Sequence, residues 1–361
     1  MCLKITATGD IFPGNMGYHS KIGIGRDFYS HRGHKWERAF LAVFSDSDVC
    51  VVNLEAPLIH DADFCNTDYF AGSIAFAHYL KHIGVTHANV ANNHILEQGL
   101  EGFNKTIMAL KKAGIEPIGL SCNGEAQVSY YESKGYSIGI AAFNDIHDIQ
   151  PCSVYASYSE GGVLATLEKM RAADVKIIVL HWGSEYTKIP SLKQLSSAER
   201  FIEAGADLVI GHHPHVVQPV IKYKDGVIAY SLGNCLFDMY HSSHVRKGCI
   251  LRASVQKGKT EFECLEILNT GLNDIHIMDK SFMHKKLRRY ESILCSWRKK
   301  SSERYNSDYR TYSRRIRLWN RVLMKLDLLY HIGHTSKKDF ACITENLSSS
   351  MKNSRHLRSV R

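Results

Sequence analysis

The sequence lacks three features that would each identify a class of protein. Its ten cysteines include no Cys-x-x-Cys pair, so neither a zinc knuckle nor a dithiol redox motif is indicated. It has no run of about 18 apolar residues, the length that crosses a bilayer, and its N-terminus is too polar for a signal peptide. It has no internal repeat. We therefore expect a cytoplasmic protein with reduced thiols, such as Cys50 and Cys249 in their apolar runs.

The composition is that of an ordinary globular chain, with 44% hydrophobic and 22% charged residues. The net charge of +9 is unevenly distributed, however. Residues 281–361 contain 20 Lys and Arg against 6 Asp and Glu, a local charge of +14, which leaves −5 for residues 1–280. We accordingly expect a globular domain at 1–280, a basic amphipathic helical region at 281–347 and a disordered tail at 348–361.

Residues 281–347 have a helical pattern. Apolar residues recur every three or four positions from 283 to 297 and again from 309 to 330, with Arg and Lys on the other faces. This predicts two amphipathic helices, or one that is interrupted near Ser301 and Ser302. The apolar stripe would pack on the globular domain or on another copy, which we favour, or lie on an anionic membrane surface. No motif supports a nucleic acid as partner.

Strand and helix patterns alternate along residues 1–280. Short β-branched or apolar runs, such as 3–8, 48–53 and 175–180, are separated by segments with helical periodicity. A hairpin is expected around Lys134 and Gly135, and a long loop at 17–35. This alternation predicts a layered α/β fold whose strands are mostly buried on both faces.

Polar residues follow several of the predicted strands. They are Asp10, Glu55, Asn93 with His94, His181, and the cluster His212, His213 and His215. Strand ends meet at one edge of an α/β fold, so these side chains are expected to converge. Alone, Asp10 could cap a turn and His181 could be a hydrogen-bonded core residue, but together they indicate a metal site. Mixed carboxylate, amide and imidazole ligands suit Zn²⁺, Mn²⁺ or Fe, which favours metal-assisted hydrolysis.

The same residues belong to six ordered motifs. These are Gly9-Asp10, Asn53-Leu54-Glu55, Ala91-Asn92-Asn93-His94, His181-Trp182-Gly183, Gly211-His212-His213-Pro214-His215 and Tyr230-Ser231-Leu232-Gly233-Asn234. In these motifs, which extend over about residues 3–255, the chain resembles the CapA family, named for poly-γ-glutamate capsule synthesis. The resemblance implies a four-layer αββα sandwich of the metallophosphoesterase type.

The resemblance also implies roles for individual residues. The metal ligands would be Asp10, Glu55, Asn93, His181, His213 and His215, and they would hold one or two divalent ions of Mn, Zn or Fe. His94 would be the catalytic general acid, and the candidate substrate-binding residues are Asn53, His212, Glu185 and Asn234. Phe12 stands two positions after Asp10, where metallophosphoesterases have a histidine, so the number of metal ions stays open. His147, His241 and His244 could line the same cleft.

Similarity to this family implies a protein of capsule or surface-polymer biosynthesis with a metal-dependent, phosphoesterase-like hydrolase site. Its substrate would be phosphorylated or a polymer precursor. The alternative is a non-catalytic assembly or recruitment component with a structural or vestigial metal site. A cytoplasmic protein that touches the membrane through residues 281–347, and that forms an oligomer, is compatible with both hypotheses.

Overall fold

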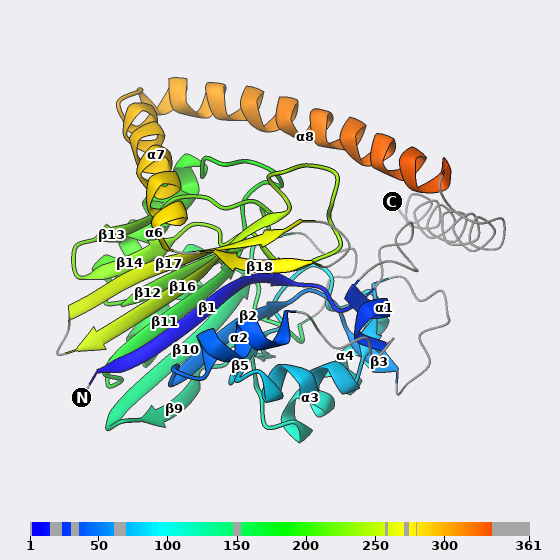
Figure 1. Cartoon of the computed structure of the whole chain (residues 1–361). Helices are drawn as coiled ribbons and strands as arrows, with labels where there is room; N and C mark the ends of the chain where they lie inside the picture. The colour runs from blue at the N-terminus through cyan, green and yellow to red at the C-terminus, as the bar shows by residue number, and fades with distance from the viewer. Residues whose placement is uncertain are drawn as a thin grey trace.

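The computed structural model describes residues 2–14, 24–29, 36–60, 70–146, 153–256, 259–270, 274–278 and 280–333. Within these residues two large β-sheets pack face to face, and helices cover their outer faces (Figure 1). The four-layer αββα sandwich predicted from the sequence is therefore confirmed. His147 and the predicted tail at 348–361 lie outside the described residues.

The larger sheet has the strand order β18-β17-β16-β1-β2-β5-β6, and β15 also pairs with β1. Its strands are β1 (Leu3–Ile11), β2 (Val49–Leu54), β5 (His87–Asn89), β6 (Glu116–Ile118), β15 (Asn234–Leu236), β16 (Lys247–Gln256), β17 (Lys259–Asn269) and β18 (Ile275–Met278). The pairs β1–β2, β2–β5 and β5–β6 are parallel, whereas β16 to β18 are antiparallel. The carboxyl ends of β1 and β2 consequently lie at one edge.

The smaller sheet has the strand order β13-β14-β12-β11-β10-β9. Its strands are β9 (Ser129–Ser133), β10 (Tyr136–Asn144), β11 (Val175–His181), β12 (Leu208–His212), β13 (Val220–Tyr223) and β14 (Gly226–Ala229). The predicted hairpin is present between β9 and β10. Its two loop residues, Lys134 and Gly135, both have positive φ, 51° and 77°, as a tight hairpin turn requires.

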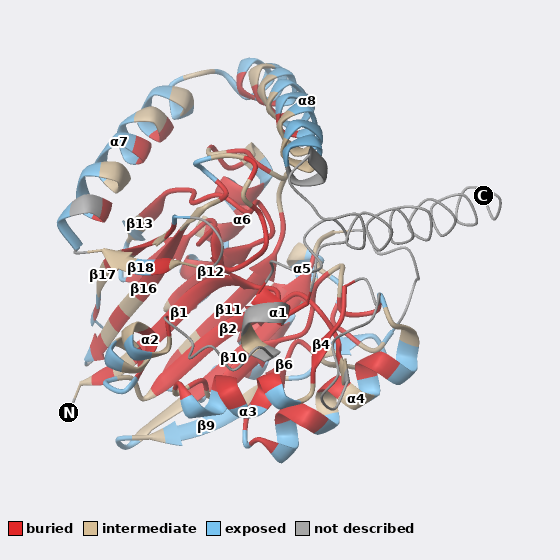
Figure 2. Cartoon of the chain, turned by 45° about the vertical axis from the view of Figure 1, so that its right-hand side comes forward, coloured by how far each residue is buried: buried red, intermediate tan, exposed pale blue. Residues whose placement is uncertain are grey.

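Helices pack on the outer face of each sheet. The larger sheet is covered by α2 (Glu37–Phe44), α3 (Ala75–His82) and α4 (Gly99–Lys112), and the smaller by α5 (Glu160–Lys169) and α6 (Leu192–Glu203). The start of α6 is determined locally, because Ser191 and Gln194 form a capping box. Most strands between these layers are buried, whereas the edge strand β9 is largely exposed (Figure 2). Short pairs complete the domain: β3 (Leu58–His60) with β4 (Gly72–Ser73), and β7 (Ser121–Cys122) with β8 (Glu125–Ala126).

The prediction of a loop at 17–35 is wrong for its described part, where residues 24–29 form α1 (Ile24–Tyr29). Ile24 is fully buried, and its backbone N–H donates to Asp238 Oδ1 at 2.7 Å. This contact joins residues 214 positions apart, so no local periodicity could indicate it.

Two further helices follow the sandwich, α7 (Lys280–Arg298) and α8 (Ser302–Gly333), and their break matches the predicted interruption. Met283 and Leu294 of α7 are buried against the domain, as are Tyr305 and Tyr309 of α8. No described helix combines the length and the apolar character that crossing a membrane requires. Cys50 and Cys249 are buried and form no disulfide, as expected.

Candidate metal centre

Strands of both sheets bring the predicted ligands to one place. Asp10 lies near the end of β1, where it pairs with Asn53 of β2, and Glu55 follows β2 directly. His181 and His212 are the last residues of β11 and β12 and face each other in register. All four side chains come from strand ends and are fully buried. The convergence expected from the sequence is thus observed.

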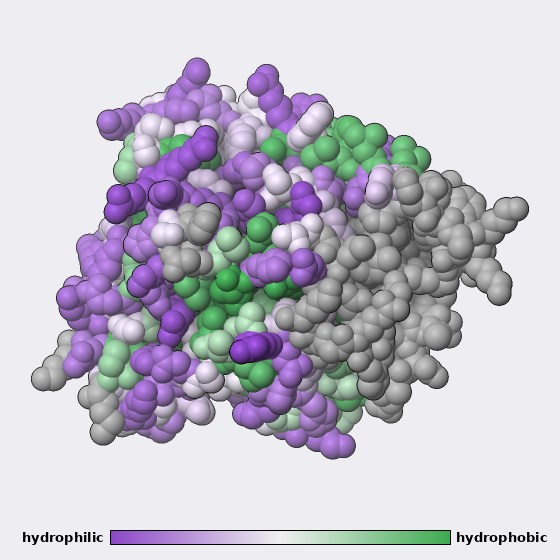
Figure 3. Space-filling view, viewed as in Figure 1, coloured by the Kyte–Doolittle hydropathy of each residue, from purple (hydrophilic) through white to green (hydrophobic). Residues whose placement is uncertain are grey.

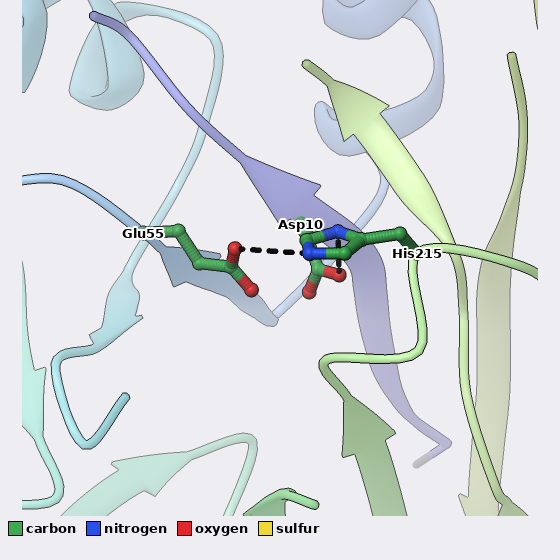
Figure 4. Close-up of side chains that lie close together, drawn as sticks. All are labelled: Asp10, Glu55 and His215. Atoms are coloured by element: carbon green, nitrogen blue, oxygen red, sulfur yellow. Dashed lines mark ion pairs between the residues drawn. The ribbon is translucent and has the colours of Figure 1, made fainter. Parts of the chain in front are cut away.

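Asp10, Glu55 and His215 form the tightest group. One potential ligand atom of each lies within 4.8 Å of the other two (Figure 4). His215 Nδ1 lies 3.3 Å from Asp10 Oδ2, and His215 Nε2 lies 3.9 Å from Glu55 Oε2. Among the described residues, this is the only group of three or more His, Cys, Asp or Glu side chains close enough to hold one ion.

A second group adjoins the first through Glu55. His181 Nδ1 lies 3.5 Å from Glu55 Oε1, and His181 Nε2 donates a hydrogen bond to Asn93 Oδ1 at 2.8 Å. The ring of His213 lies 5.0 Å from that of His181, centroid to centroid. Asn93 and His213 therefore both adjoin His181, and Glu55 lies between His181 and His215.

The histidine loop has an unusual backbone. His213 and His215 both have positive φ, 92° and 55°, which non-glycine residues rarely adopt. Gly211 just before them has no room for a Cβ, which would collide with the carbonyl oxygen of Tyr230. Such strain is found where a structure must aim particular side chains, here two imidazoles at the carboxylates.

Buried amides orient the carboxylates from behind. Asn53 Nδ2 donates to Asp10 Oδ1 at 2.8 Å and to Glu55 Oε1 at 2.9 Å. Asn89 Nδ2 in turn donates to Asn53 Oδ1 at 2.9 Å. Sequence analysis missed Asn89, because it ends β5 two residues before the motif Ala91-Asn92-Asn93-His94. The signal available in the sequence was that Asn89, like the predicted ligands, is a polar residue at the end of a strand.

Of the remaining candidate substrate-binding residues, His212 and Asn234 are buried, whereas Glu185 is partly exposed. His212 Nδ1 donates to Asp10 Oδ1 at 3.0 Å. Asn234 Oδ1 accepts from His215 Nδ1 at 2.9 Å. Glu185 is partly exposed, and its charge contributes to the raised pKa of His215. Asn53, His212 and Asn234 are thus buried and hydrogen-bonded to predicted ligands.

His94 differs from the ligands in being partly exposed, with 20% of its side-chain surface accessible. Its Nδ1 donates to Glu97 Oε1 at 3.1 Å, and its Nε2 accepts from Asn93 Nδ2 at 3.1 Å. The ring stacks on Phe70, with centroids 4.5 Å apart. His94 is thus fixed on both sides and remains reachable from solvent.

Phe12 occupies the position where metallophosphoesterases have a histidine. It is fully buried and packs against Phe70 and Phe237, with ring centroids 5.1 and 5.0 Å away. Of the other histidines, His241 contacts the Tyr186 ring at 5.7 Å, near His215. His244 pairs with Lys188 Nζ at 2.8 Å.

Burial and neighbouring charges shift the pKa values of the predicted metal ligands in different directions. Burial raises the pKa of Asp10, but the hydrogen bond from His212 and the nearby imidazole of His215 outweigh it and hold that pKa well below its usual range. Burial and the Asp10 charge raise the pKa of Glu55. Burial lowers the pKa of His215, but the charges of Glu55 and Asp10 reverse this and raise it to about 10. A cation in this space would take over the role of these protons.

The donor set fits a divalent transition metal. Among the described residues, four buried atoms of this site lack a hydrogen-bond partner: Asp10 Oδ2, Glu55 Oε2, His212 Nε2 and His213 Nδ1. Each unpartnered buried polar atom costs about 1–3 kcal/mol. Burial lowers the pKa of His181, and it lowers that of His213 to about 3, so both rings are neutral and able to bind metal. Oxygen and imidazole nitrogen together suit Mn, Zn or Fe.

Comparison with known proteins agrees with this geometry. The family described as bacterial capsule synthesis protein PGA_cap matches residues 4–239. The chain belongs to this family. The matched residues include every predicted metal ligand. It is 29% identical over 211 residues to PGA biosynthesis protein CapA of Bacillus subtilis (strain 168), covering 54% of this chain and 55% of the relative.

It is also 35% identical over 173 residues to capsule biosynthesis protein CapA of Bacillus anthracis, covering 44% of this chain and 42% of the relative. The chain thus spans about half the length of these relatives. Among solved structures it is similar to calcineurin-like phosphoesterase YfkN from Bacillus subtilis, with a TM-score of 0.46 and 14% identity, over 83% of this chain and 99% of that one. It is also similar to a 5'-nucleotidase from Candida albicans, with a TM-score of 0.42 and 11% identity, over 81% of this chain and 58% of that one.

Proposed function

We propose that the protein is a metal-dependent, phosphoesterase-like hydrolase of capsule or surface-polymer synthesis. Its substrate is a phosphorylated compound or a polymer precursor. The observation that carries the proposal is the buried group of Asp10, Glu55 and His215, with unpartnered ligand atoms, beside the partly exposed His94.

Asp10, Glu55 and His215 would hold one metal ion of Mn, Zn or Fe, and Glu55, Asn93, His181 and His213 would hold a second. When bound, such ions activate a water molecule and stabilise the charge that develops on a phosphoryl group. Because Phe12 supplies no ligand, the first site depends on three protein side chains, and it is the weaker of the two.

The residues around the metal have distinct tasks. Asn53 fixes both carboxylates through its amide, so that their free oxygens point into the site. His94 acts as general acid in its protonated form: Nε2–H, released from its contact with Asn93 Nδ2, delivers a proton to the leaving-group oxygen, while Nδ1–H remains hydrogen-bonded to Glu97 Oε1. Phe70 stacks on the imidazole and prevents it from rotating away.

A non-catalytic role in polymer assembly is the second candidate, and one observation favours it. Phe12, Phe70 and Phe237 fill with apolar rings the position from which a further ligand would come. In that case the metal stabilises the fold at the strand ends, and the partly exposed surface at His94 and Glu185 contacts other components.

Hydrolysis of simple phosphomonoesters and phosphodiesters by the full-length protein, with and without Mn²⁺, separates the two candidates. The hydrolase predicts turnover that requires Mn²⁺ and falls in His94→Ala, while that variant still binds metal. His276→Ala, a histidine with 52% of its side chain exposed in β18, is the matched control and should retain full activity. Metal binding without turnover of either ester class would favour the assembly role.

Contact of residues 281–347 with an anionic membrane, which the sequence also suggests, concerns α7 and α8 and is independent of this chemistry.

A further inference from the structure

Helix α8 has two faces, and within the described residues its buried side chains lie on the inner face. The inner face contains the buried residues Tyr305, Tyr309, Ser313 and Asn320. Tyr305 Oη donates to Pro190 O at 2.7 Å. The outer face is open to solvent along the second half of the helix, where residues 317–319, 321 and 322 are all exposed.

The outer face of α8 is apolar. Its exposed side chains are Leu318 (52%), Trp319 (58%), Val322 (47%), Leu326 (56%), Leu329 (62%) and Tyr330 (63%). At 3.6 residues per turn they fall within one arc of about 120°, which begins beside the buried residues and extends round the outer side of the helix. Six of the ten exposed large hydrophobic residues in the described chain are therefore on this one surface (Figure 3). A contiguous exposed patch of this kind marks an interaction site.

A row of exposed cations borders the apolar arc. At the same helical spacing, Arg310, Arg314, Arg317, Arg321 and Lys325 fall together on one flank of α8. No Asp or Glu occurs from residue 309 to residue 326. The occupant of this surface must therefore accept apolar side chains and carry negative charge beside them.

We propose that the outer face of α8 docks on an anionic membrane surface. An amphipathic helix with aromatic and aliphatic side chains on one arc and cations beside it inserts at the boundary between headgroups and acyl chains. A second copy of the chain does not supply the complementary charge, because pairing two such faces would bring one basic flank against another.

Among the described residues of the helical region, the exposed apolar side chains place the membrane contact on the second half of α8. The apolar residues Met283 and Leu294 of α7 are buried against the domain and are not available. The inner face of α8 also reaches the rim of the metal centre. Asn320 Oδ1 accepts from His241 Nε2 at 3.2 Å, and Tyr186 Oη donates to Met324 Sδ at 3.8 Å. Docking would hold that rim close to the bilayer.

Sedimentation of the full-length protein with lipid vesicles tests the proposal. We expect binding to vesicles of phosphatidylglycerol and phosphatidylcholine, and none to phosphatidylcholine alone. The triple variant Trp319→Ser/Leu326→Ser/Leu329→Ser should lose binding. Its matched control is Leu100→Ser/Met108→Ser, which removes apolar side chains that are 51% and 64% exposed elsewhere, and it should bind as the wild type does.

The charge contribution is tested by Arg314→Gln/Arg321→Gln/Lys325→Gln. One cation near an anionic surface contributes about fivefold to binding, so the three should lower it by about 100-fold at low salt. In the wild type, brominated lipids should quench Trp319, which is exposed, and spare the buried Trp36 and Trp182.

Three results would overturn the proposal. One is the absence of wild-type binding to phosphatidylglycerol vesicles, and another is equal binding by the triple variant. The third is a dimer in solution, detected by light scattering, that the triple variant abolishes, because it would assign the apolar arc to a second copy of the chain. None of these results depends on hydrolase activity.

Discussion

Replacing Asp10 by asparagine removes one charge from the centre of the site at almost constant volume. Asp10 accepts hydrogen bonds from Asn53 at 2.8 Å and from His212 at 3.0 Å, and it lies 3.3 Å from His215. Breaking a buried ion pair typically costs about 3–5 kcal/mol. The Asp10 charge also raises the pKa of Glu55, so this pKa should fall in the variant and the Glu55 carboxylate can replace part of the lost interaction. We therefore expect a loss of about 3 kcal/mol in the metal-free protein.

The same variant should lose its stabilisation by metal. A ligand that binds only the folded state stabilises it by about 2.7 kcal/mol at a concentration 100 times its dissociation constant. Urea unfolding at pH 7, in a chelator and then in Mn²⁺, measures both effects. The control is Asp46→Asn, whose carboxylate pairs with Lys4 and Arg252 at the surface and should have little effect. The reasoning fails if metal-free Asp10→Asn is as stable as wild type, or if Mn²⁺ stabilises both equally.

Three further predictions concern the general acid His94, the buried His87 and the tightly packed Gly211. In the Mn²⁺-loaded enzyme His94→Ala should lower kcat by about 10²–10⁴-fold, and unchanged metal content would distinguish this loss from loss of the site. Burial lowers the pKa of His87 to about 4, so the unfolded chain binds more protons below pH 6.5 and stability falls as the pH is lowered towards 4. Between pH 7 and pH 5, unfolding curves should show a loss about 2 kcal/mol smaller in His87→Gln than in wild type, and an equal loss would refute the assignment. Gly211→Ala should destabilise the fold by about 3 kcal/mol in urea titrations because its Cβ meets the Tyr230 carbonyl, whereas the control Gly161→Ala, with no atom within 4 Å of its Cβ, should be neutral or stabilising.

The layered fold could be predicted because its causes are local. Apolar runs end at polar residues in β1, β2 and β11, and this pattern places Asp10, Glu55 and His181 at strand ends. The parallel pairing of β1 with β2 and of β11 with β12 then brings these ends together. Since alternating strands and helices imply parallel strands whose carboxyl ends share one edge, the convergence could be predicted without knowing the order of the strands.

The features that were missed depend on contacts between distant residues. α1 is held by Asp238, and Asn89 acts through Asn53, which is 36 residues away in the sequence. The positive φ of His213 and His215 results from the packing of the loop and has no signature in residue type. That α7 buries Met283, Tyr290 and Leu294 while the second half of α8 exposes its apolar residues is equally invisible in their similar periodic patterns.

Metal content tests the central claim most directly. The full-length protein should be loaded with Mn²⁺, dialysed and analysed for bound metal beside His215→Ala and the exposed-histidine control His276→Ala. The metal centre predicts at least one equivalent of Mn²⁺ in the wild type and in His276→Ala, and a clear loss in His215→Ala. Wild-type protein that retains no metal, or His215→Ala that retains as much as the wild type, would contradict it.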